Sequence, residues 1–169
     1  NYLKTKGYIY QSTIEDINFP IINCKHKTNT QTNTQTTTTT YIIKVLDGNA
    51  VNDPILQDII INEIEINKHL MTVVKPEDKK YIMVPIELLF DDEFDVFYIV
   101  MEQMSGVLTK IKSTIFINNC NPILSKIIKC INTLHHYNVV HSDLKQDNIF
   151  YRIDNGIVTI KLGDFGASN

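Results

Sequence analysis

The chain has 169 residues, 43% of them hydrophobic and 21% charged, which is enough for a globular core. Its 16 Lys and Arg residues against 19 Asp and Glu residues give a formal net charge of −3, so it lacks the basic footprint of a nucleic-acid-binding domain. No apolar run approaches the roughly 20 residues of a transmembrane helix, and we expect no membrane segment.

The first 46 residues predict a turn, a long loop and a strand. Gly7 can form a turn within residues 5–10, although a single glycine is unspecific. Residues 25–40 are Thr-, Asn- and Gln-rich and contain no apolar side chain, which predicts a disordered insertion. Its threonines could accept phosphate, but an inert insertion is the favoured interpretation. Residues 41–46 are β-branched and predict a strand that carries Lys44.

A helix is predicted to begin at Asp53-Pro54, because an N-cap residue is followed there by proline at the first helical position. Six apolar residues recur at helical spacing and are expected to face the core: Ile55, Leu56, Ile59, Ile60, Ile66 and Leu70. Glu63 falls on the same face, whereas Glu65 is expected to be solvated. A glutamate on a buried face requires a cation, and Lys44 is the candidate.

Strands and a second helix are predicted in the middle of the chain. Residues 82–89 and 95–101 read as strands on either side of the acidic turn 91–93. The second helix is predicted from Asn121-Pro122 to about residue 138. Its expected core face consists of Ile123, Leu124, Ile127, Ile128, Ile131 and Leu134. Residues 149–151 and 157–162 then predict a hairpin around the turn 154–156.

Two short motifs near the end of the chain carry reactive groups. The first is His-Ser-Asp-Leu-Lys-Gln-Asp-Asn at residues 141–148, and the second is Asp-Phe-Gly at residues 164–166. Phosphoryl transfer needs metal ions at the phosphates, positive charge near the moving group and an acceptor held in line. Asp143 can accept the proton of a hydroxyl, and Lys145 can neutralise the γ-phosphate. Asn148 and Asp164 can hold magnesium through hard oxygen ligands.

In sequence and order, the two motifs resemble the catalytic loop and the magnesium loop of eukaryotic-type protein kinases. The lysine two residues after Asp143 is typical of the serine/threonine branch. A chance match to the first motif is on the order of 1 in 10,000 in a chain of this size. The resemblance therefore identifies a kinase-like chain.

The resemblance implies an α+β fold with two lobes. Residues 1–104 would form an N-lobe with an antiparallel sheet, one helix called αC and the insertion at about 25–40. Residues 105–169 would begin a helical C-lobe. Kinases continue beyond this point, so we expect the chain to be truncated just after Asp-Phe-Gly and to be inactive by itself.

The resemblance also implies a role for each motif residue. Asp143, Lys145 and Asn148 would be catalytic, and Asn148 with Asp164 would bind magnesium. Lys44 would contact the α- and β-phosphates of ATP, with Glu63 as its ion-pair partner on αC.

The remaining nucleotide contacts are also implied by the resemblance. Met101 would be the gatekeeper beside the adenine, which the backbones of Glu102 and Met104 would bind. Phe150 is a further predicted nucleotide contact. Gly7 would be the remnant of the glycine-rich phosphate loop, unless that loop lies upstream of this sequence.

The function expected from these residues is an ATP-dependent protein serine/threonine kinase that uses Mg²⁺. Its partners would be a protein with a Ser or Thr acceptor and a regulatory protein. A nucleotide-binding pseudokinase or interaction module is the alternative, because Ile42 and Asn67 replace smaller or apolar family residues and the glycine loop is degraded. A kinase-like small-molecule phosphotransferase is a third interpretation, against which the Asp-Phe-Gly motif argues.

Two further expectations concern location and regulation. Cys24, Cys120 and Cys130 lack metal-site spacing, and no signal-peptide pattern opens the sequence, which favours an intracellular protein, cytoplasmic or nuclear, with free thiols. Ser142 stands where many kinases have an arginine that binds an activation-segment phosphate. Because a neutral hydroxyl cannot supply that charged pairing, we expect activity to be independent of such a phosphate.

Overall fold

The computed structural model describes residues 2–14, 19–29, 36–48 and 53–169, which form two compact units. The first unit comprises Asn1–Pro54 and Pro85–Gln103, and the second comprises Ile55–Val84 and Met104–Asn169. Each unit has its own cluster of buried apolar side chains. Within the described residues, no helix is both long and apolar enough to cross a membrane.

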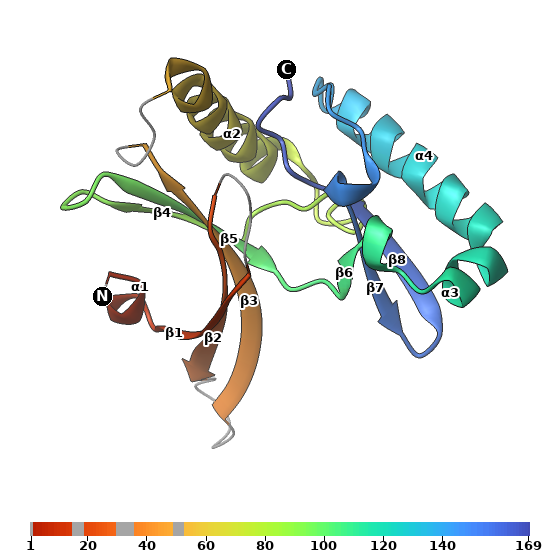
Figure 1. Cartoon of the computed structure of the whole chain (residues 1–169), viewed down its shortest axis with the longest axis horizontal. Helices are drawn as coiled ribbons and strands as arrows, with labels where there is room; N and C mark the ends of the chain where they lie inside the picture. Colours follow the sequence, from red (N-terminus) through yellow and green to blue (C-terminus); the bar gives the residue numbers. More distant parts are fainter. Residues whose placement is uncertain (1, 15–18, 30–35, 49–52) are drawn as a thin grey trace. The chain divides into compact units, whose positions relative to one another are not determined.

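The first unit is an antiparallel sheet preceded by the short helix α1 (Tyr2–Thr5). The sheet has the order β1-β2-β3-β5-β4, as Figure 1 shows. Its strands are β1 (Tyr8–Ile14), β2 (Ile21–Asn29), β3 (Thr36–Asp47), β4 (Glu87–Asp91) and β5 (Val96–Glu102). Lys44 lies on the central strand β3, opposite Ile21 on one side and Ile99 on the other. It is therefore an interior lysine of the sheet, with 8% of its surface exposed.

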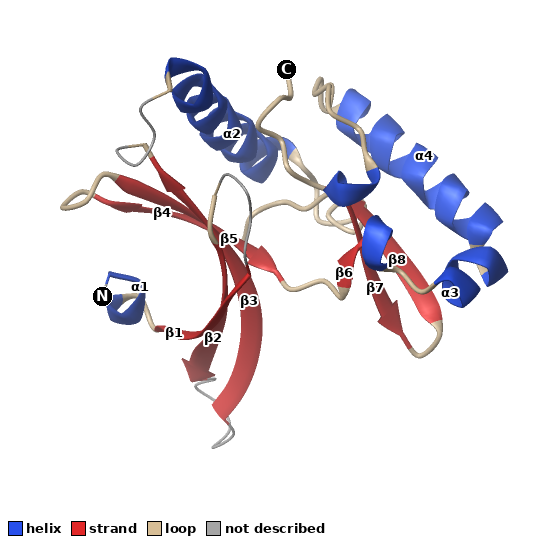
Figure 2. Ribbon diagram, in the orientation of Figure 1, coloured by secondary structure: helices blue, strands red, loops and turns tan. Residues whose placement is uncertain are grey.

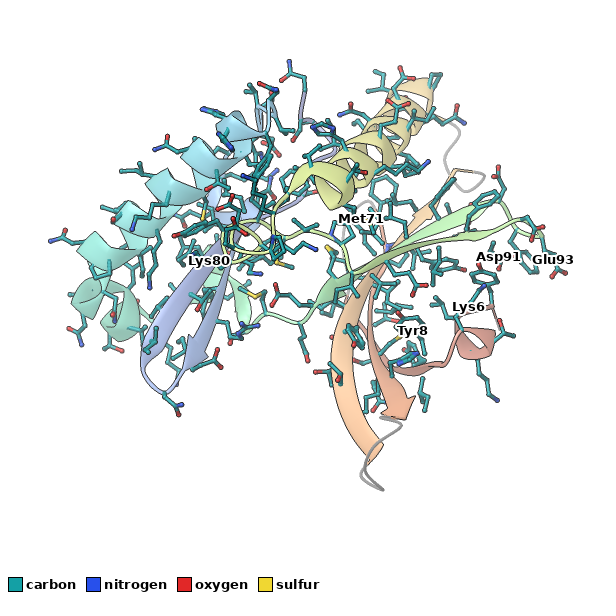
Figure 3. All side chains as sticks on the ribbon, turned by 180° about the vertical axis from the view of Figure 1, so that it is seen from behind. Lys6, Tyr8, Met71, Lys80, Asp91 and Glu93 are labelled. Atoms are coloured by element: carbon teal, nitrogen blue, oxygen red, sulfur yellow. The ribbon has the colours of Figure 1, made fainter. Side chains whose placement is uncertain are left out.

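The core of the first unit lies between α1 and the sheet. Tyr8, Cys24, Ile43, Leu89 and Val100 form its buried part. Figure 3 shows Tyr8 on this side of the sheet, near Lys6, and its hydroxyl donates to Glu87 over 2.8 Å. At the far end of β4, the backbone N–H of Glu93 donates to Asp91 over 3.2 Å, in the predicted acidic turn (Figure 3).

The expected disorder of residues 25–40 is wrong for the part of that segment that the structure describes. β2 continues to Asn29 and β3 begins at Thr36, and their register runs from Lys25 opposite Thr40 to Asn29 opposite Thr36. The ladder satisfies the backbone donors and acceptors whatever the side chains are, and threonine is a good strand former. Residues 30–35 lie outside the described part of the chain.

The second unit combines helices with a small sheet (Figure 2). Helix α2 (Pro54–Val73) begins at the predicted proline. The three-stranded sheet has the order β6-β7-β8. The remaining elements are β6 (Gly106–Val107), the 3₁₀ turn η1 (Leu108–Lys110), α3 (Ser113–Asn118), α4 (Cys120–His136), the 3₁₀ turn η2 (Gln146–Asn148), β7 (Ile149–Asp154) and β8 (Ile157–Leu162).

Helix α4 packs against β8, and both contribute to the core of the second unit. The thiol of Cys130 donates to the carbonyl of Ile160 over 3.5 Å, and the ammonium of Lys126 donates to the carbonyl of Val158. Leu70, at the end of α2, belongs to the same buried cluster. That cluster also holds Val74, Ile82, Ile123, Leu134, Ile149, Leu162 and Phe165.

Three of the apolar residues that we expected in the core are exposed instead. Ile55 is 69% exposed on α2, and Leu124 and Ile128 are 49% and 58% exposed on α4. On α4 the buried residues are Ile123, Cys130 and Leu134, whose spacing of seven and four follows one narrow row. Leu124 and Ile128 lie beside that row, so helical spacing overestimated the width of the buried face.

The predicted strand 82–89 is divided between the two units. Ile82 pairs with Leu162 in the second unit, whereas β4 of the first unit begins at Glu87. Pro85, which lacks a backbone N–H, lies between the two parts and interrupts the ladder. Residues 55–84 group with the second unit, which differs from the predicted lobe of residues 1–104. The predicted strand 95–101 and the hairpin of residues 149–162 are confirmed as β5 and β7–β8.

The buried row of α4 can be tested by truncating its side chains. Ile123→Ala should lower the free energy of unfolding of the second unit by about 2–5 kcal/mol, because it leaves a cavity at a fully buried position. Ile128→Ala, the same change at an exposed position of the same helix, should change it by less than about 0.5 kcal/mol. Urea unfolding monitored by circular dichroism measures both. Equal losses in the two variants would contradict the packing described.

Candidate active site

The loop of residues 141–148 connects the end of α4 to β7 in a tightly turned path. Ser142 adopts a left-handed backbone with φ 59°, and the N–H of Asp143 donates to the carbonyl of His141 over 2.8 Å. Farther along, the N–H of Asn148 donates to the carbonyl of Lys145 over 3.1 Å. These two short turns bring the side chains of Asp143, Lys145 and Asn148 together.

Two neighbouring side chains hold the carboxylate of Asp143. Its Oδ2 accepts from the Nζ of Lys145 over 2.6 Å and from the Nδ2 of Asn148 over 3.1 Å. The same Nδ2 also donates to the backbone carbonyl of Asp143 over 2.9 Å. Among the described residues, no donor bonds the other carboxylate oxygen. That oxygen can therefore accept a proton from an incoming hydroxyl, and the Asp143 side chain is 42% exposed.

Charge in the loop keeps Asp143 ionised. The hydrogen bond from Lys145 is the main cause that lowers the pKa of Asp143, and the bond from Asn148 adds to it. The partner shifts in the opposite direction: the hydrogen bond to Asp143 raises the pKa of Lys145, and the negative charges of Asp164 and Asp147 raise it further. The ammonium of Lys145 thus interacts with three carboxylates in this part of the second unit.

The side chain of Asn148 fits a role as an oxygen ligand for a cation. Both of its bonds use Nδ2 with oxygen acceptors, so the amide nitrogen must lie on that side and Oδ1 on the other. The residue is 2% exposed, and its backbone carbonyl accepts from the N–H of Gly163 over 3.1 Å. This bond holds the amide of Asn148 beside the loop that carries Asp164.

Asp164 supplies a carboxylate from an exposed, left-handed position with φ 65°. A carboxylate and an amide oxygen are hard ligands of the kind that Mg²⁺ binds, with water and phosphate oxygens completing its coordination. The described residues contain no group of three or more His, Cys, Asp and Glu side chains that could hold a metal. A site with few protein ligands, as magnesium with a nucleotide requires, fits these residues.

The backbone before Asp164 is closely packed. A Cβ on Gly163 would lie 2.9 Å from both the Cβ of Met83 and the Cε2 of Phe150, so only glycine fits there. The Nε2 of His141 lies 3.0 Å from the carbonyl of Gly163, and its ring packs against Phe165 with centroids 5.6 Å apart. His141 is thus a buried structural residue beside Phe165.

Helix α2 faces the same loop with Glu63. A Cβ on Gly166 would lie 2.9 Å from the Cγ2 of Ile59 and 3.6 Å from Oε2 of Glu63. Glu63 is 3% exposed, and Glu65 is exposed as expected. The structure therefore places Glu63, Asp143, Lys145, Asn148 and Asp164 in one unit.

Asn67, which the sequence marks as an unusual polar residue, is accommodated in the buried face of α2. It is 2% exposed, and its Nδ2 donates to the carbonyl of Glu63 over 2.8 Å. A hydrogen bond to the preceding helical turn offsets the cost of burying the amide. This removes one of the three arguments for the pseudokinase.

The predicted nucleotide contacts are divided between the units. Lys44, Met101 and Glu102 belong to the first unit, where the Nζ of Lys44 lies 5.5 Å from the ring centroid of Phe19 and Met101 is opposite Ile42. Met104 and Phe150 belong to the second unit, and Met104 is 6% exposed. The ion pair between Lys44 and Glu63 would join the two units and stays a prediction.

The structure places Gly7 differently from the expected phosphate loop. Gly7 lies in the turn between α1 and β1, with φ 86°, and a Cβ there would lie 2.8 Å from Nε2 of His26. A glycine-rich phosphate loop connects two strands, and here β1 and β2 are joined by residues 15–20. Residues 15–18 lie outside the described part of the chain. Sequence spacing cannot distinguish a turn glycine at the start of a strand from one at a loop tip, and a nucleotide contact by Gly7 stays a prediction.

Comparisons with known proteins agree with this geometry. The family described as "Protein kinase domain" matches residues 28–169. The chain is 25% identical over 167 residues to the serine/threonine-protein kinase GRIK1 of Arabidopsis thaliana, covering 96% of this chain and 36% of that protein. It is 26% identical over 180 residues to calcium-dependent protein kinase 6 of Plasmodium berghei (strain Anka), covering 98% of this chain and 11% of that protein.

A third relative is similar over a shorter stretch. The chain is 31% identical over 77 residues to the serine/threonine-protein kinase dkf-2 of Caenorhabditis briggsae, covering 43% of this chain and 6% of that protein. The chain therefore spans about a third or less of the length of these curated relatives.

The contact between Lys145 and Asp143 can be tested by titration. Lys145→Met should raise the pKa of Asp143 towards its ordinary value of about 3.9, because the main cause of the depression is removed. A depressed carboxyl pKa contributes stability above the unfolded-state pKa that is lost as the pH falls through the folded-state pKa. The variant should therefore lose less stability than the wild type on acidification from pH 5.

The carboxyl ¹³C shift of Asp143 followed by NMR between pH 2 and pH 6 (about two units either side of the ordinary pKa) measures the midpoint. Lys129→Met, at an exposed lysine of α4, is the matched control and should leave the Asp143 midpoint unchanged. An unchanged midpoint in Lys145→Met would show that the ammonium does not act on this carboxylate.

Proposed function

Because this chain belongs to the protein kinase domain family, we propose that it is part of an ATP-dependent protein serine/threonine kinase. The reaction would transfer the γ-phosphoryl group of Mg-ATP to a serine or threonine hydroxyl of a protein. The observation that carries the proposal is the Asp143 carboxylate, held on one oxygen by Lys145 and Asn148.

Asp143 would act on the acceptor hydroxyl. Its depressed pKa keeps it ionised at neutral pH, so it can receive a hydrogen bond from the hydroxyl. It would accept the hydroxyl proton as the new oxygen–phosphorus bond forms and the bond between the γ-phosphorus and the β-phosphate oxygen breaks, with ADP as the leaving group. The hydrogen bonds from Lys145 and Asn148 fix the direction of the carboxylate. The orientation of the acceptor is therefore set before a substrate arrives.

Lys145 would supply positive charge to the phosphoryl group. Its raised pKa keeps the ammonium protonated at neutral pH, and its side chain is 51% exposed. An exposed lysine next to the proton acceptor can contact both the acceptor carboxylate and the phosphate that approaches it.

Asn148 and Asp164 would hold Mg²⁺ through Oδ1 and the carboxylate. When bound, the metal supplies charge neutralisation at the β- and γ-phosphates. The protein holds the two ligands in place through the Gly163 bond to the Asn148 carbonyl. Lys44 would bind the α- and β-phosphates, with Glu63 as its partner, while Met101, Glu102, Met104 and Phe150 would contact adenine.

Two observations support serine or threonine as the residue that accepts the phosphoryl group. The lysine two residues after Asp143 is the residue of the serine/threonine branch. The relatives named serine/threonine-protein kinases point the same way at 25% to 31% identity. The protein substrate and an intracellular location are parts of the same proposal.

A nucleotide-binding or interaction module without catalysis is the second candidate. It is favoured by the connection between β1 and β2, where residues 15–20 contain no glycine that could bring backbone amides close to phosphates. The candidates differ in their response to magnesium, because only the kinase needs metal to present the γ-phosphate.

Magnesium-dependent nucleotide binding distinguishes them. Thermal shift with ATP should give a larger rise in melting temperature with Mg²⁺ than without it, and Asp164→Ala should abolish that difference because the metal loses its carboxylate ligand. Asp92→Ala, at an exposed turn of the first unit, should retain it. Equal shifts with and without Mg²⁺ in the wild type would favour the interaction module.

Turnover is to be measured in the protein at its natural length. There, Asp143→Asn should lower kcat by on the order of 100-fold or more with ATP affinity within about threefold, because Asp143 acts on the acceptor and not on the nucleotide. Phosphate transfer to a serine peptide and ATP binding are measured side by side, with Asp92→Asn as the control. A loss of ATP affinity that accounts for the whole effect would contradict the assigned role.

A further inference from the structure

Asn62 makes two hydrogen bonds for which the proposed reaction has no role. Its Nδ2 donates to the carbonyl of Gly166 over 3.0 Å and to the carbonyl of Ser168 over 2.7 Å. A carboxamide has two N–H donors, and both are directed at carbonyls on one short segment more than 100 residues away in sequence. Asn62 therefore ties helix α2 to the segment that follows Asp164.

The helix and the segment are also in close contact at this point. Ile59, Asn62 and Glu63 have the spacing i, i+3, i+4 and share one face of α2. A Cβ on Gly166 would approach the Cγ2 of Ile59 to 2.9 Å, so the glycine allows the backbone to lie against the helix. The hydrogen bonds of Asn62 thus form at a packed surface, where they can hold a defined geometry.

The opposite side of the segment is held by the catalytic loop. Val140 and Asn169 exchange two backbone hydrogen bonds of 2.7 and 3.0 Å. The hydroxyl of Ser168, a residue only 2% exposed, donates to the carbonyl of His141 over 3.1 Å. The hydroxyl of Ser142 donates to Oδ1 of Asn169 over 2.9 Å.

These contacts hold residues 166–169 between α2 and the catalytic loop without any charged group. Ser142, the residue that replaces the phosphate-binding arginine of many kinases, takes part directly. Its neutral bond to Asn169 is one of these contacts.

We propose that Asn62 is a positioning residue that holds the metal-binding loop, residues 164–166, in place for Mg²⁺. Asp164 precedes Gly166 by two residues and has a left-handed backbone, a conformation that a non-glycine residue keeps only when its surroundings hold it. Asn62 fixes the far end of that loop, and through the loop it fixes Asp164. This role in metal binding rests on the proposed function, whereas the ordering of residues 166–169 does not.

Hydrogen exchange of the whole chain, free of nucleotide, tests the ordering. The amides of Ser168 and Asn169 donate to Phe165 and Val140. In Asn62→Asp, which keeps the shape of the side chain but loses its donors, these two amides should exchange about tenfold faster. Asn62→Ala, a second variant with high helix propensity, should have the same effect. Asn121→Asp and Asn121→Ala, at an exposed position of α4, are the matched controls and should leave both rates unchanged.

A magnesium titration of nucleotide binding tests the positioning role. In Asn62→Ala, the MgCl₂ concentration for half-maximal ATP binding should rise about tenfold, with ATP binding in EDTA within about twofold of the wild type. An equal loss with and without Mg²⁺ would show a general structural role and overturn the proposal. Unchanged exchange of Ser168 and Asn169 in both Asn62 variants would overturn it as well.

The experiments distinguish a failure of the proposed function from a failure of the inference about Asn62. If the wild type binds no nucleotide, the proposed function and the role in metal binding are both wrong, and the exchange rates still decide whether Asn62 orders the segment. If the wild type binds Mg-ATP and the Asn62 variants match it in both measurements, the proposed function stands and this inference is wrong.

Discussion

The buried amide of Asn148 is the contact on which the rest of the candidate site depends. Its nitrogen bonds both the backbone and the carboxylate of Asp143, and its own backbone carbonyl accepts from Gly163. The Asn148 side chain therefore fixes the direction of the Asp143 carboxylate, and the Asn148 backbone holds the loop that carries Asp164. An amide suits this position because it has donors on one side and an acceptor on the other. A carboxylate there would repel Asp143, and an apolar residue would lose both hydrogen bonds to Asp143.

Backbone geometry, more than charge, assembles the second unit around that contact. Several places require a small residue or an unusual backbone, among them Gly163 against Met83, Gly166 against Ile59, and the left-handed Asp164. Each brings a loop close to a neighbouring element. Two buried polar side chains of this unit, Asn67 and Ser168, form neutral hydrogen bonds to backbone carbonyls. Lys145 lies among carboxylates at the exposed end of the unit.

The main feature of the first unit is a lysine held inside a sheet. Lys44 lies on the central strand with paired strands on both sides, so its backbone is fixed by ladders in both directions. The polar extension of β2 and β3 beyond the core lengthens the same ladder. Threonine-rich sequence can join a strand without a buried face, because the hydrogen bonds of the ladder are made by the backbone.

The sequence alone determined which reactive groups the two motifs carry and the order of most elements. The residue types and spacing of 141–148 and 164–166 supply a carboxylate, an amine and an amide and carry the resemblance to protein kinases, and local signals such as Asp53-Pro54 and the turn 154–156 place helix and strand starts. Tertiary structure alone decided which helix face is buried, since Leu124 and Ile128 fit the periodicity but lie beside the packed row.

Tertiary structure also decided that residues 25–29 and 36–40 pair as strands, that Gly7 precedes the first strand, and that Asn62 reaches Gly166 and Ser168. The physical reason is the same in each case. Propensity and motif are properties of neighbours in sequence, whereas a ladder partner, a packed row or a hydrogen bond across 104 residues is set by the folded chain.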